Sequence, residues 1–333
     1  MPIKTYREAI NEALLQEMKK DENVVVIGED VAGGAGTNGE QDAWGGVLGV
    51  TKGLLKHFGR ERIIDTPITE TAIMGMASGA ALTGLRPVAE LMFVDFMGVC
   101  FDQILNQTAK FRYMFGGKAV TPLTIRTMYG GGLRAASQHS QCLYPMFTHV
   151  PGIKVVLPSN PYDAKGLLIQ SIRDNDPVIF MEHKNLYDTS GDVPDESYSI
   201  PFGEANFTRE GKDLTFIAMG QTVEICNNVA DTLKKEGKTC TVLDLRTLSP
   251  LDEDSILEAA EETGKIVIVD ESYPRCNVAT DISALICQKS FDSLKAGIKM
   301  VTPPHTPVPF SPPLEDLYLP SEEKVLNVAQ EII

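Results

Sequence analysis

The sequence predicts an α/β protein with two domains, each built on a mainly parallel sheet. Unbroken apolar runs such as VVVI in NVVVIGED and VIF in DPVIFMEH are typical of strands buried on both faces. Helical segments such as PYDAKGLLIQSIRDN alternate with these runs. The same alternation restarts near residue 205, and 333 residues are more than one core usually organises.

Each element has its own local signal. Thr5 and Glu8 have capping-box spacing, and apolar residues from Ile10 to Met18 follow at helical intervals, which predicts an amphipathic helix. Further strands of the first domain are expected in RPVAELMF, TPLTIRTMYG and IKVVLPS. In the second domain we expect strands in LTFIAMG, CTVLDLRTLSP, KIVIVDES and IKMVTPP, and helices in TVEICNNVADTLKKEG, EDSILEAAEETG and NVATDISALICQKSFDSL.

The boundary between the domains is predicted from composition. DTSGDVPDESYSIPFGE is rich in Pro, Gly, Ser and acids and has no sustained periodicity, which is typical of a linker. We therefore expect a first domain at 1–188, a linker at 189–204 and a second domain at 205–333. Near the C-terminus, TPPHTPVPFSPPLEDLYLP is too proline-rich for a central strand or a helix, so we expect an extended arm over a surface.

Composition narrows the class of protein. A net charge of −15 opposes binding to nucleic acid and to anionic membranes, so we expect neither as a partner. No segment has the ~18 unbroken apolar residues of a membrane span, and MPIKTYREAI does not resemble a signal peptide. The 6 cysteines are far apart without a C-x-x-C pair, which argues against zinc and disulfides. A cytoplasmic location is the expectation.

The residues alone assign no catalytic role. In DTPITETAIMGMASGAALTG, Glu70 precedes a long uncharged stretch, but an acid is also favoured near a helix N-terminus, and Thr66 and Pro67 resemble an N-cap and a first helical residue. His139 follows a strand and a glycine-rich turn, where a lone histidine is more often a surface residue. GEDVAGGAGTNGE lacks a nucleotide-binding fingerprint, although its acids follow a strand at an edge where α/β sheets bind ligands.

A resemblance to a known family favours a catalytic interpretation of these residues. The blocks DTPITE, GLRPVAELMF, QHSQ, DAKGLL, DNDPV and DLRTLSPLD, in this order over nearly the whole chain, resemble the β subunit of the thiamine-diphosphate-dependent E1 component of 2-oxo acid dehydrogenase complexes. DAWGGVLGVTKGL, DESYPRCNVATDI and PHTPVPFSPPLEDLY are most similar to its acetoin dehydrogenase branch. The resemblance implies a transketolase-like pyrimidine-binding domain followed by a transketolase C-terminal domain.

The resemblance also implies site residues. Glu70 would bind N1′ of the cofactor's aminopyrimidine, a role that needs a protonated carboxyl in a poorly solvated site. Ile68 and Phe96 match the pyrimidine pocket, although both are also typical core residues. His139 would act as an acid while the acyl group passes to the lipoyl arm. A structural K⁺ would bind mostly backbone oxygens of Leu123, Ser171, Ile172, Asp174 and Asp176, although SIRDNDP equally resembles a helix end.

Half of the cofactor site is expected on another chain. The family holds Mg²⁺ and the diphosphate with a G-D-G motif, and this sequence contains none. The resemblance therefore implies an E1 α subunit as partner in an α₂β₂ heterotetramer and a lipoyl acyltransferase, E2, as the acceptor. The proline-rich C-terminal segment and the helix expected to begin near Thr66 suggest large buried contacts, so we expect the chain to form at least a homodimer even without α. The small residues that follow Glu70 would let a neighbouring helix approach closely and exclude water: Ala72, Gly75, Ala77, Gly79 and Ala80.

The implied reaction is cleavage of acetoin to acetaldehyde and an enzyme-bound hydroxyethyl group, which is passed oxidatively as acetyl to lipoamide. Acids in EQDAWGG, beside Trp44, would repel a substrate carboxylate and so favour a neutral hydroxyketone. The alternatives are a pyruvate or branched-chain 2-oxo acid E1 β subunit, a non-catalytic scaffold subunit, and a single-chain transketolase-like enzyme. Retention of Glu70 and His139 opposes the scaffold, and the missing motif and short length oppose the single-chain enzyme.

Overall fold

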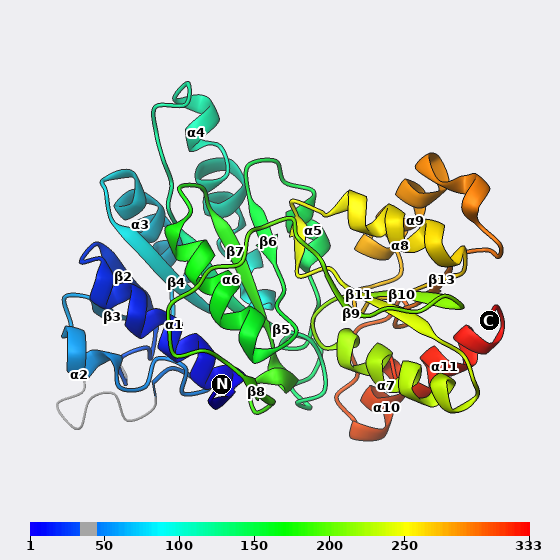
Figure 1. Ribbon diagram of the computed structural model, residues 1–333. Coiled ribbons are helices and arrows are strands. Elements are labelled where there is room, and N and C mark those ends of the chain that lie inside the picture. Colours follow the sequence, from blue (N-terminus) through cyan, green and yellow to red (C-terminus); the bar gives the residue numbers. More distant parts are fainter. Residues whose placement is uncertain (34–44) are drawn as a thin grey trace.

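The computed structural model describes residues 1–33 and 45–333 (Figure 1). Two α/β units lie side by side, the N-terminal unit with a seven-stranded sheet and the C-terminal unit with a five-stranded sheet. The predicted fold class, α/β with two mainly parallel sheets, is confirmed. Trp44 and most of the predicted loop GEDVAGGAGTNGE lie outside the described residues.

The N-terminal sheet is parallel except at one edge. In spatial order its strands are β12 (Thr247–Ser249), β6 (Lys154–Val156), β7 (Val178–His183), β5 (Thr124–Tyr129), β4 (Arg86–Phe93), β2 (Val24–Glu29) and β3 (Ile63–Thr66). Only β12 runs antiparallel to its neighbour. Every residue of β5 and β7 is buried, as the unbroken apolar runs predict. The carboxyl ends of the parallel strands therefore meet at one edge of the sheet.

Helices cover both faces of this sheet (Figure 1). One core lies beneath α1 (Tyr6–Lys20) and α6 (Pro161–Arg173). The opposite core contains α3 (Glu70–Leu82) and α5 (Tyr144–Thr148) together with the short helical turns η1 (Val94–Gly98) and η2 (Gln103–Thr108). The shorter α2 (Leu54–Phe58) and α4 (Phe111–Met114) lie further out (Figure 1). The predicted capping box is present, with Thr5 N donating to Glu8 (2.8 Å) and Glu8 N donating to the Thr5 hydroxyl (3.2 Å).

The helix that carries Glu70 begins later than the sequence predicts. Thr66 is the last residue of β3 and pairs with Glu29 of β2, so it cannot serve as an N-cap. Residues 67–69 turn the chain, and α3 starts at Glu70 itself. The expected helix start near Thr66 was therefore wrong, because strand pairing extends through that residue.

The C-terminal unit repeats the architecture on a smaller scale. Its strand order is β14 (Lys299–Val301), β13 (Ile266–Val269), β10 (Leu214–Ala218), β11 (Cys240–Asp244) and β9 (Asn206–Arg209), with β9 antiparallel. Core residues of α7 (Thr222–Lys235) and α11 (Glu322–Gln330) pack on one face, and those of α8 (Glu253–Thr263) and α9 (Val278–Lys289) on the other. The strands and helices predicted for this half of the chain are confirmed.

The two units are joined by more than the connecting chain. Strand β12, from the C-terminal half of the sequence, pairs with β6 at the edge of the N-terminal sheet. Within the predicted linker at 189–204, β8 (Ser190–Asp192) pairs with β1 (Ile3–Thr5), and one hydrophobic core contains residues of both units. The segment is thus packed onto the first unit, and the domain boundaries themselves stay a prediction.

The proline-rich C-terminal segment is only partly the extended arm that the sequence predicts. Residues 302–311 contain no helix or strand, but α10 (Pro312–Tyr318) follows. Pro312 and Pro313 occupy the first positions of that helix, where an N–H group has no intrahelical acceptor, so proline costs nothing there. The expectation that these prolines exclude a helix was wrong for this reason.

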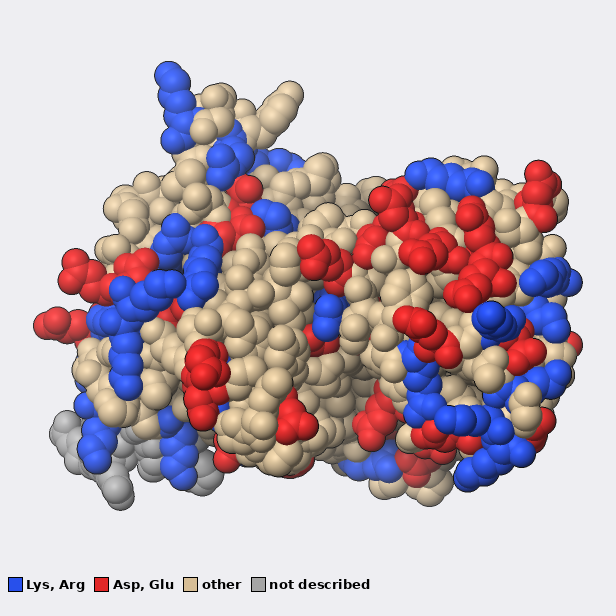
Figure 2. All heavy atoms as spheres, viewed as in Figure 1, with Lys and Arg blue, Asp and Glu red and all other residues tan. Residues whose placement is uncertain are grey.

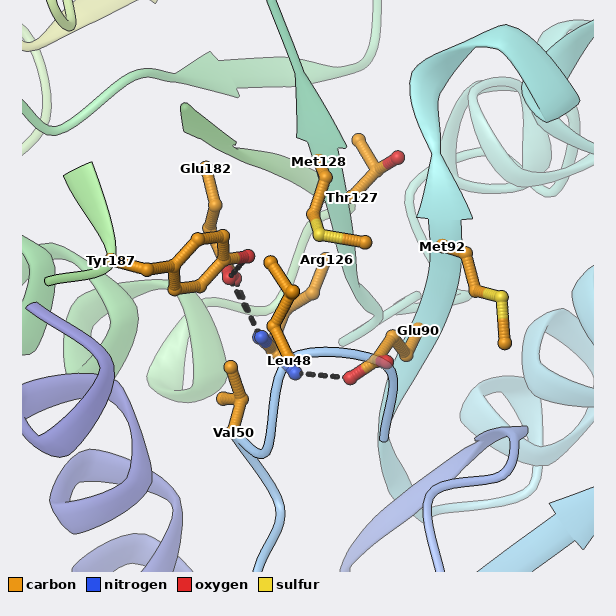
Figure 3. A pocket seen from close by; sticks show the side chains of 9 residues that line it. All are labelled: Leu48, Val50, Glu90, Met92, Arg126, Thr127, Met128, Glu182 and Tyr187. Atoms are coloured by element: carbon orange, nitrogen blue, oxygen red, sulfur yellow. Dashed lines mark hydrogen bonds and ion pairs between the residues drawn. The ribbon is translucent and has the colours of Figure 1, made fainter. Parts of the chain in front are cut away.

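A buried arginine cross-links the centre of the N-terminal sheet (Figure 3). Arg126 on β5 donates from Nε and Nη2 to Glu182 on β7 (2.6 and 2.7 Å) and from Nη1 to Glu90 on β4 (2.7 Å). The Tyr187 hydroxyl donates to Glu182 (2.5 Å). Burial raises the pKa of Glu90 although Arg126 opposes the shift. The other residues lining this small pocket are Leu48, Val50, Met92, Thr127 and Met128.

A second buried ionic group joins two of the sequence blocks, DAKGLL and DLRTLSPLD. Arg246 binds Asp163 through two bonds of 2.7 and 3.0 Å. Asp244 accepts a hydrogen bond from the Arg246 backbone N–H (3.0 Å) and one from the Ser159 hydroxyl. Burial and the neighbouring charge of Asp163 raise the pKa of Asp244 to about 7.

Charged side chains of both signs are mixed over the face in Figure 2, and acidic ones gather over α8. Among the described residues, no helix is long and apolar enough to cross a membrane. The expectations of no nucleic-acid partner and no membrane partner stay predictions.

We expect Asp244→Asn to reduce the loss of stability as pH rises from acidic to neutral values. The folded pKa lies above the ordinary value, so the stability that Asp244 contributes is full below pH ~4 and is lost as pH rises through about 7. The neutral asparagine does not titrate, so Tm should fall less between pH 5 and pH 8 in the variant than in the wild type. Thermal unfolding at both pH values measures this. The exposed Asp292→Asn is the control, and an unchanged pH dependence in Asp244→Asn would contradict the prediction.

Candidate active site

The predicted site residues follow the carboxyl ends of neighbouring strands. Strands β5, β4, β2 and β3 lie side by side and are parallel. Glu29 ends β2, Glu70 follows β3, Phe96 follows β4 and His139 follows β5. Open α/β sheets bind ligands at this edge. The topology thus brings to one edge residues that are far apart in the sequence.

Two carboxyl groups lie near each other at this edge. Glu70 heads α3 and is half-buried, and Glu29 stands at the end of β2. The pKa of Glu29 is raised, first by burial and then by the negative charges of Asp30 and Glu70. Like charges in a partly desolvated site favour retention of a proton. The edge can therefore hold a proton on a carboxyl group beside the start of α3.

His139 packs against two aromatic rings. Its imidazole makes edge contacts with Phe93 and Phe96, at 5.0 and 5.3 Å between ring centroids, and the two phenyl rings are 5.5 Å apart. The His139 backbone N–H donates to the carbonyl of Ala136 (3.3 Å). His139 is half-buried, so this packing fixes the ring while one side stays open. This packing argues against the alternative of a lone surface histidine, and the catalytic role of His139 stays a prediction.

The turn η1 connects the two predicted catalytic residues. It carries Phe96, which contacts His139, and it is followed by Val99, whose carbonyl accepts a hydrogen bond from the Thr71 hydroxyl (3.0 Å). Thr71 is the neighbour of Glu70 in α3. Glu70 and His139 are therefore fixed relative to each other through one short segment.

The apolar residues predicted for the pyrimidine pocket are not core residues. Ile68 is 75% exposed in the turn before α3, and Phe96 is only partly buried. Of the small residues that follow Glu70, Ala77 is buried, whereas Ala72, Gly75 and Gly79 lie on the exposed face of α3. An apolar helix face next to a carboxyl group is thus accessible to a ligand or to another chain.

The residues predicted to bind K⁺ gather where α6 ends and β5 and β7 begin: Leu123, Ser171, Ile172, Asp174 and Asp176. Arg86 donates to the carbonyl oxygens of Ile172 (3.1 Å) and Asp174 (3.0 Å). Lys154 binds the Asp174 carboxylate at 2.8 Å. The segments are brought together, and positive side chains already use several of their oxygens.

Sequence reasoning missed two residues of this edge. Phe93 packs on His139, and its spacing from Phe96 in FVDF is a signal that could have indicated a shared cluster. Lys184 follows β7, and its ammonium group donates to the carbonyl of His139. Nothing in the sequence around Lys184 points to His139, because the two meet only through the strand order.

Comparisons with known proteins identify the domains of the chain. Residues 4–189 match the transketolase pyrimidine-binding domain and residues 203–325 match the transketolase C-terminal domain. A solved structure described as a split-gene transketolase, inactive β₄ tetramer, shares the fold with a TM-score of 0.78 at 20% identity, covering 98% of this chain and 97% of that one. The chain is a transketolase-like protein.

Relatives of higher identity narrow the family further. The chain is 63% identical to the β subunit of acetoin:2,6-dichlorophenolindophenol oxidoreductase from Cupriavidus necator, over 97% of this chain and 95% of the relative. It is 58% identical to the Bacillus subtilis protein of the same name, over 98% and 96%. The pyruvate dehydrogenase E1 β subunit of Bacillus subtilis is 43% identical, over 99% and 98%. The chain belongs to the family of E1 β subunits.

Proposed function

We propose that this chain is the β subunit of a thiamine-diphosphate-dependent acetoin dehydrogenase E1. The enzyme cleaves acetoin to acetaldehyde and passes the remaining two-carbon unit as acetyl to the lipoyl group of an E2 acyltransferase. The observation that carries the proposal is the pairing of Glu70 at the head of α3 with His139 and Phe96 at the same sheet edge. The 63% identity to an acetoin oxidoreductase β subunit favours this substrate.

The residues at the edge fit the aminopyrimidine half of the cofactor. When bound, thiamine diphosphate supplies a nucleophilic thiazolium carbon and an electron sink for C–C cleavage. Glu70 would hold a proton against N1′, Phe96 would contact the ring face, and the exposed Ile68 would cover it. Glu29, whose pKa is raised beside Glu70, keeps negative charge at this edge low.

The diphosphate half must come from elsewhere. The sequence contains no G-D-G motif, and within residues 1–33 and 45–333 no group of three His, Cys, Asp or Glu side chains could hold a metal ion. We therefore assign Mg²⁺ and the diphosphate to an α subunit. The exposed face of α3, with Ala72, Gly75, Met76 and Gly79, would pack against the neighbouring chain in an α₂β₂ assembly that also contains a β homodimer.

His139 is suited to donate a proton to the acyl acceptor. An imidazole nitrogen can donate a proton, and the ring is held by Phe93 and Phe96 while the residue stays partly exposed. The proposal therefore assigns His139 to acetyl transfer and Glu70 to the cofactor. The cytoplasmic location inferred from the sequence is part of the same proposal.

Acids at the edge favour a neutral substrate. Asp30 follows β2, and its negative charge would repel a substrate carboxylate. The related argument from EQDAWGG and Trp44 concerns residues of which most lie outside the described part of the chain.

We also propose a structural K⁺ at the end of α6. A carbonyl oxygen has two lone pairs, so Ile172 and Asp174 can each accept from Arg86 and still bind a cation. Backbone oxygens of Leu123, Ser171 and Asp176 would complete the donor set.

The substrate assignment predicts a clear preference. The reconstituted α/β complex with thiamine diphosphate and Mg²⁺ should show a kcat/KM for acetoin at least about tenfold above those for pyruvate and branched-chain 2-oxo acids, a difference of ~1.4 kcal/mol. Reduction of 2,6-dichlorophenolindophenol measures all three, and the β chain alone should reduce no dye. A preference for a 2-oxo acid would overturn acetoin as the substrate, and no activity with any of them would favour a scaffold subunit.

Glu70→Gln should abolish most activity without unfolding the protein. The amide keeps the shape of the side chain but cannot manage the N1′ proton, so turnover should fall on the order of 10²-fold or more. Dye reduction by the reconstituted complex measures turnover, and sedimentation confirms assembly. The control is Glu61→Gln, at an exposed position. If Glu70→Gln kept near wild-type turnover, Glu70 would have no catalytic role and would only stabilise the N-terminus of α3.

The potassium proposal predicts a stability that depends on the cation. Because a bound ion stabilises only the folded state, a K⁺ concentration 100 times its Kd should add roughly 2.7 kcal/mol. Tm measured in KCl should exceed Tm in NaCl or choline chloride at equal ionic strength. Equal values in the three salts would remove K⁺ from the proposal.

A further inference from the structure

Lys184 is a buried lysine that contacts the predicted acid His139. It begins η3 (Lys184–Leu186), directly after β7, and is only 3% exposed. Its ammonium group donates to the backbone carbonyl of His139 and lies 5.2 Å from the ring centroid of Phe93. Phe93 in turn packs against the imidazole of His139. Lys184 therefore holds His139 both at the backbone and through the ring that orients its side chain.

Acids of both units act on the charge of this lysine. Burial lowers the pKa of Lys184, and the negative charges of Asp95, Glu271 and Glu315 act against that shift. Glu271 follows β13, and Glu315 lies in α10 of the C-terminal segment and is fully buried. A buried ammonium group is tolerated only with such compensation.

The same acids bind the base of the segment that carries His139, residues 130–142, which we term the histidine loop. Gly131 N donates to Glu271 (2.7 Å) and Gly132 N donates to Glu315 (2.7 Å). Glu271 also binds the imidazole of His183 at 2.8 Å. The first residues of the histidine loop are thus fixed by two buried carboxylates that come from the other unit.

The far end of the histidine loop is fixed as well. The Gln141 side chain donates to Asp95 (2.8 Å), and the Ser137 hydroxyl donates to the carbonyl of Val308 (2.8 Å) in the C-terminal segment. Gly130, at the start, has a φ of +94°, and a Cβ there would overlap the ring of His183. The loop is therefore held by contacts near both ends, and Lys184 contacts it at His139.

We propose that Lys184 is a positioning residue that holds His139 for acetyl transfer to the lipoyl group, supported by Glu271 and Glu315. This inference rests on the proposed function. In the transfer, the lipoyl disulfide bond would break, one sulfur would bond to the two-carbon unit and the other would take a proton from His139. The bond between the two-carbon unit and the cofactor would then break, and the hydroxyl group of the unit would lose its proton as the acetyl carbonyl forms. The two electrons that the two-carbon unit loses reduce the disulfide. The correct placement of His139 thus matters for this step.

An artificial electron acceptor separates this step from the earlier ones. The relatives are named for the dye 2,6-dichlorophenolindophenol, which accepts electrons and no acyl group. Dye reduction therefore reports C–C cleavage and oxidation without the protonation of a lipoyl sulfur. A residue that only stabilises the fold would change both activities equally.

The test measures acetylation of a lipoyl domain and dye reduction in the assembled α/β complex that carries Lys184→Met. Methionine is unbranched and apolar, like the aliphatic part of lysine, but it has no charge and no hydrogen-bond donor. We expect kcat/KM for acetylation of a free lipoyl domain, divided by kcat/KM for dye reduction with acetoin, to fall at least about tenfold. A ratio equal to that of the wild type would overturn the proposal.

Lys165→Met is the matched control. Lys165 is also a fully buried lysine, donates to the carbonyl of Pro194 (2.5 Å) and lies 5.4 Å from the Tyr198 ring, but its ion pair is with Glu12 of α1. We expect Lys165→Met to lower Tm and leave the ratio unchanged. If it lowers the ratio as much as Lys184→Met does, the effect belongs to buried lysines in general and the proposal fails.

A second variant decides the matter if Lys184→Met does not assemble. Glu315→Gln keeps an acceptor for Gly132 N but removes the charge that faces Lys184 and Arg134, so the ratio should fall as well. An unchanged ratio in Glu315→Gln would then overturn the proposal. A wild-type complex that reduces no dye with acetoin would instead refute the proposed function on which it rests.

Discussion

The buried guanidinium of Arg126 is the interaction on which the arrangement of the N-terminal sheet depends. It lies on the central strand β5 and binds carboxylates on both neighbouring strands, β4 and β7, with all three side chains almost fully buried. Removing one partner of such a group leaves an uncompensated buried charge, which costs about 3–5 kcal/mol. The strands that end at the candidate site are therefore cross-linked by side chains as well as by their backbone hydrogen bonds.

This cross-link has a direct bearing on the site. The chain segments that carry Phe96, His139 and Lys184 leave the sheet at the ends of β4, β5 and β7, the three strands that Arg126 joins. Their relative positions are thus set inside the first unit. The final placement of the histidine loop needs the second unit, since Glu271 and Glu315 bind its glycine turn. One unit sets the spacing of the site, and the other fixes the loop within it.

Sequence patterns predicted the long buried strands and the longer helices because burial on one or both faces leaves a periodic signal, as in VVVI of β2 and in α1. The shorter strands β1, β3, β8 and β9 were not predicted, because three or four residues carry too little of this signal. Glu70 and His139 were identified by family resemblance, not by periodicity. The start of α3 was placed too early because strand pairing extends through Thr66. The helix at Pro312 was missed because proline is tolerated in the first turn of a helix. Lys184 could not be predicted, since its contact with His139 exists only once β5 and β7 are neighbours.

The antiparallel strand β12 has a consequence for synthesis on the ribosome. It covers β6, the outer parallel strand of the N-terminal sheet, but it is encoded after β9, β10 and β11 of the other unit. Until residues 247–249 leave the exit tunnel, β6 presents unpaired backbone groups, which is the condition under which sheet edges pair with other chains. The β6 edge of the N-terminal sheet is therefore covered only after about half of the C-terminal unit has been synthesised.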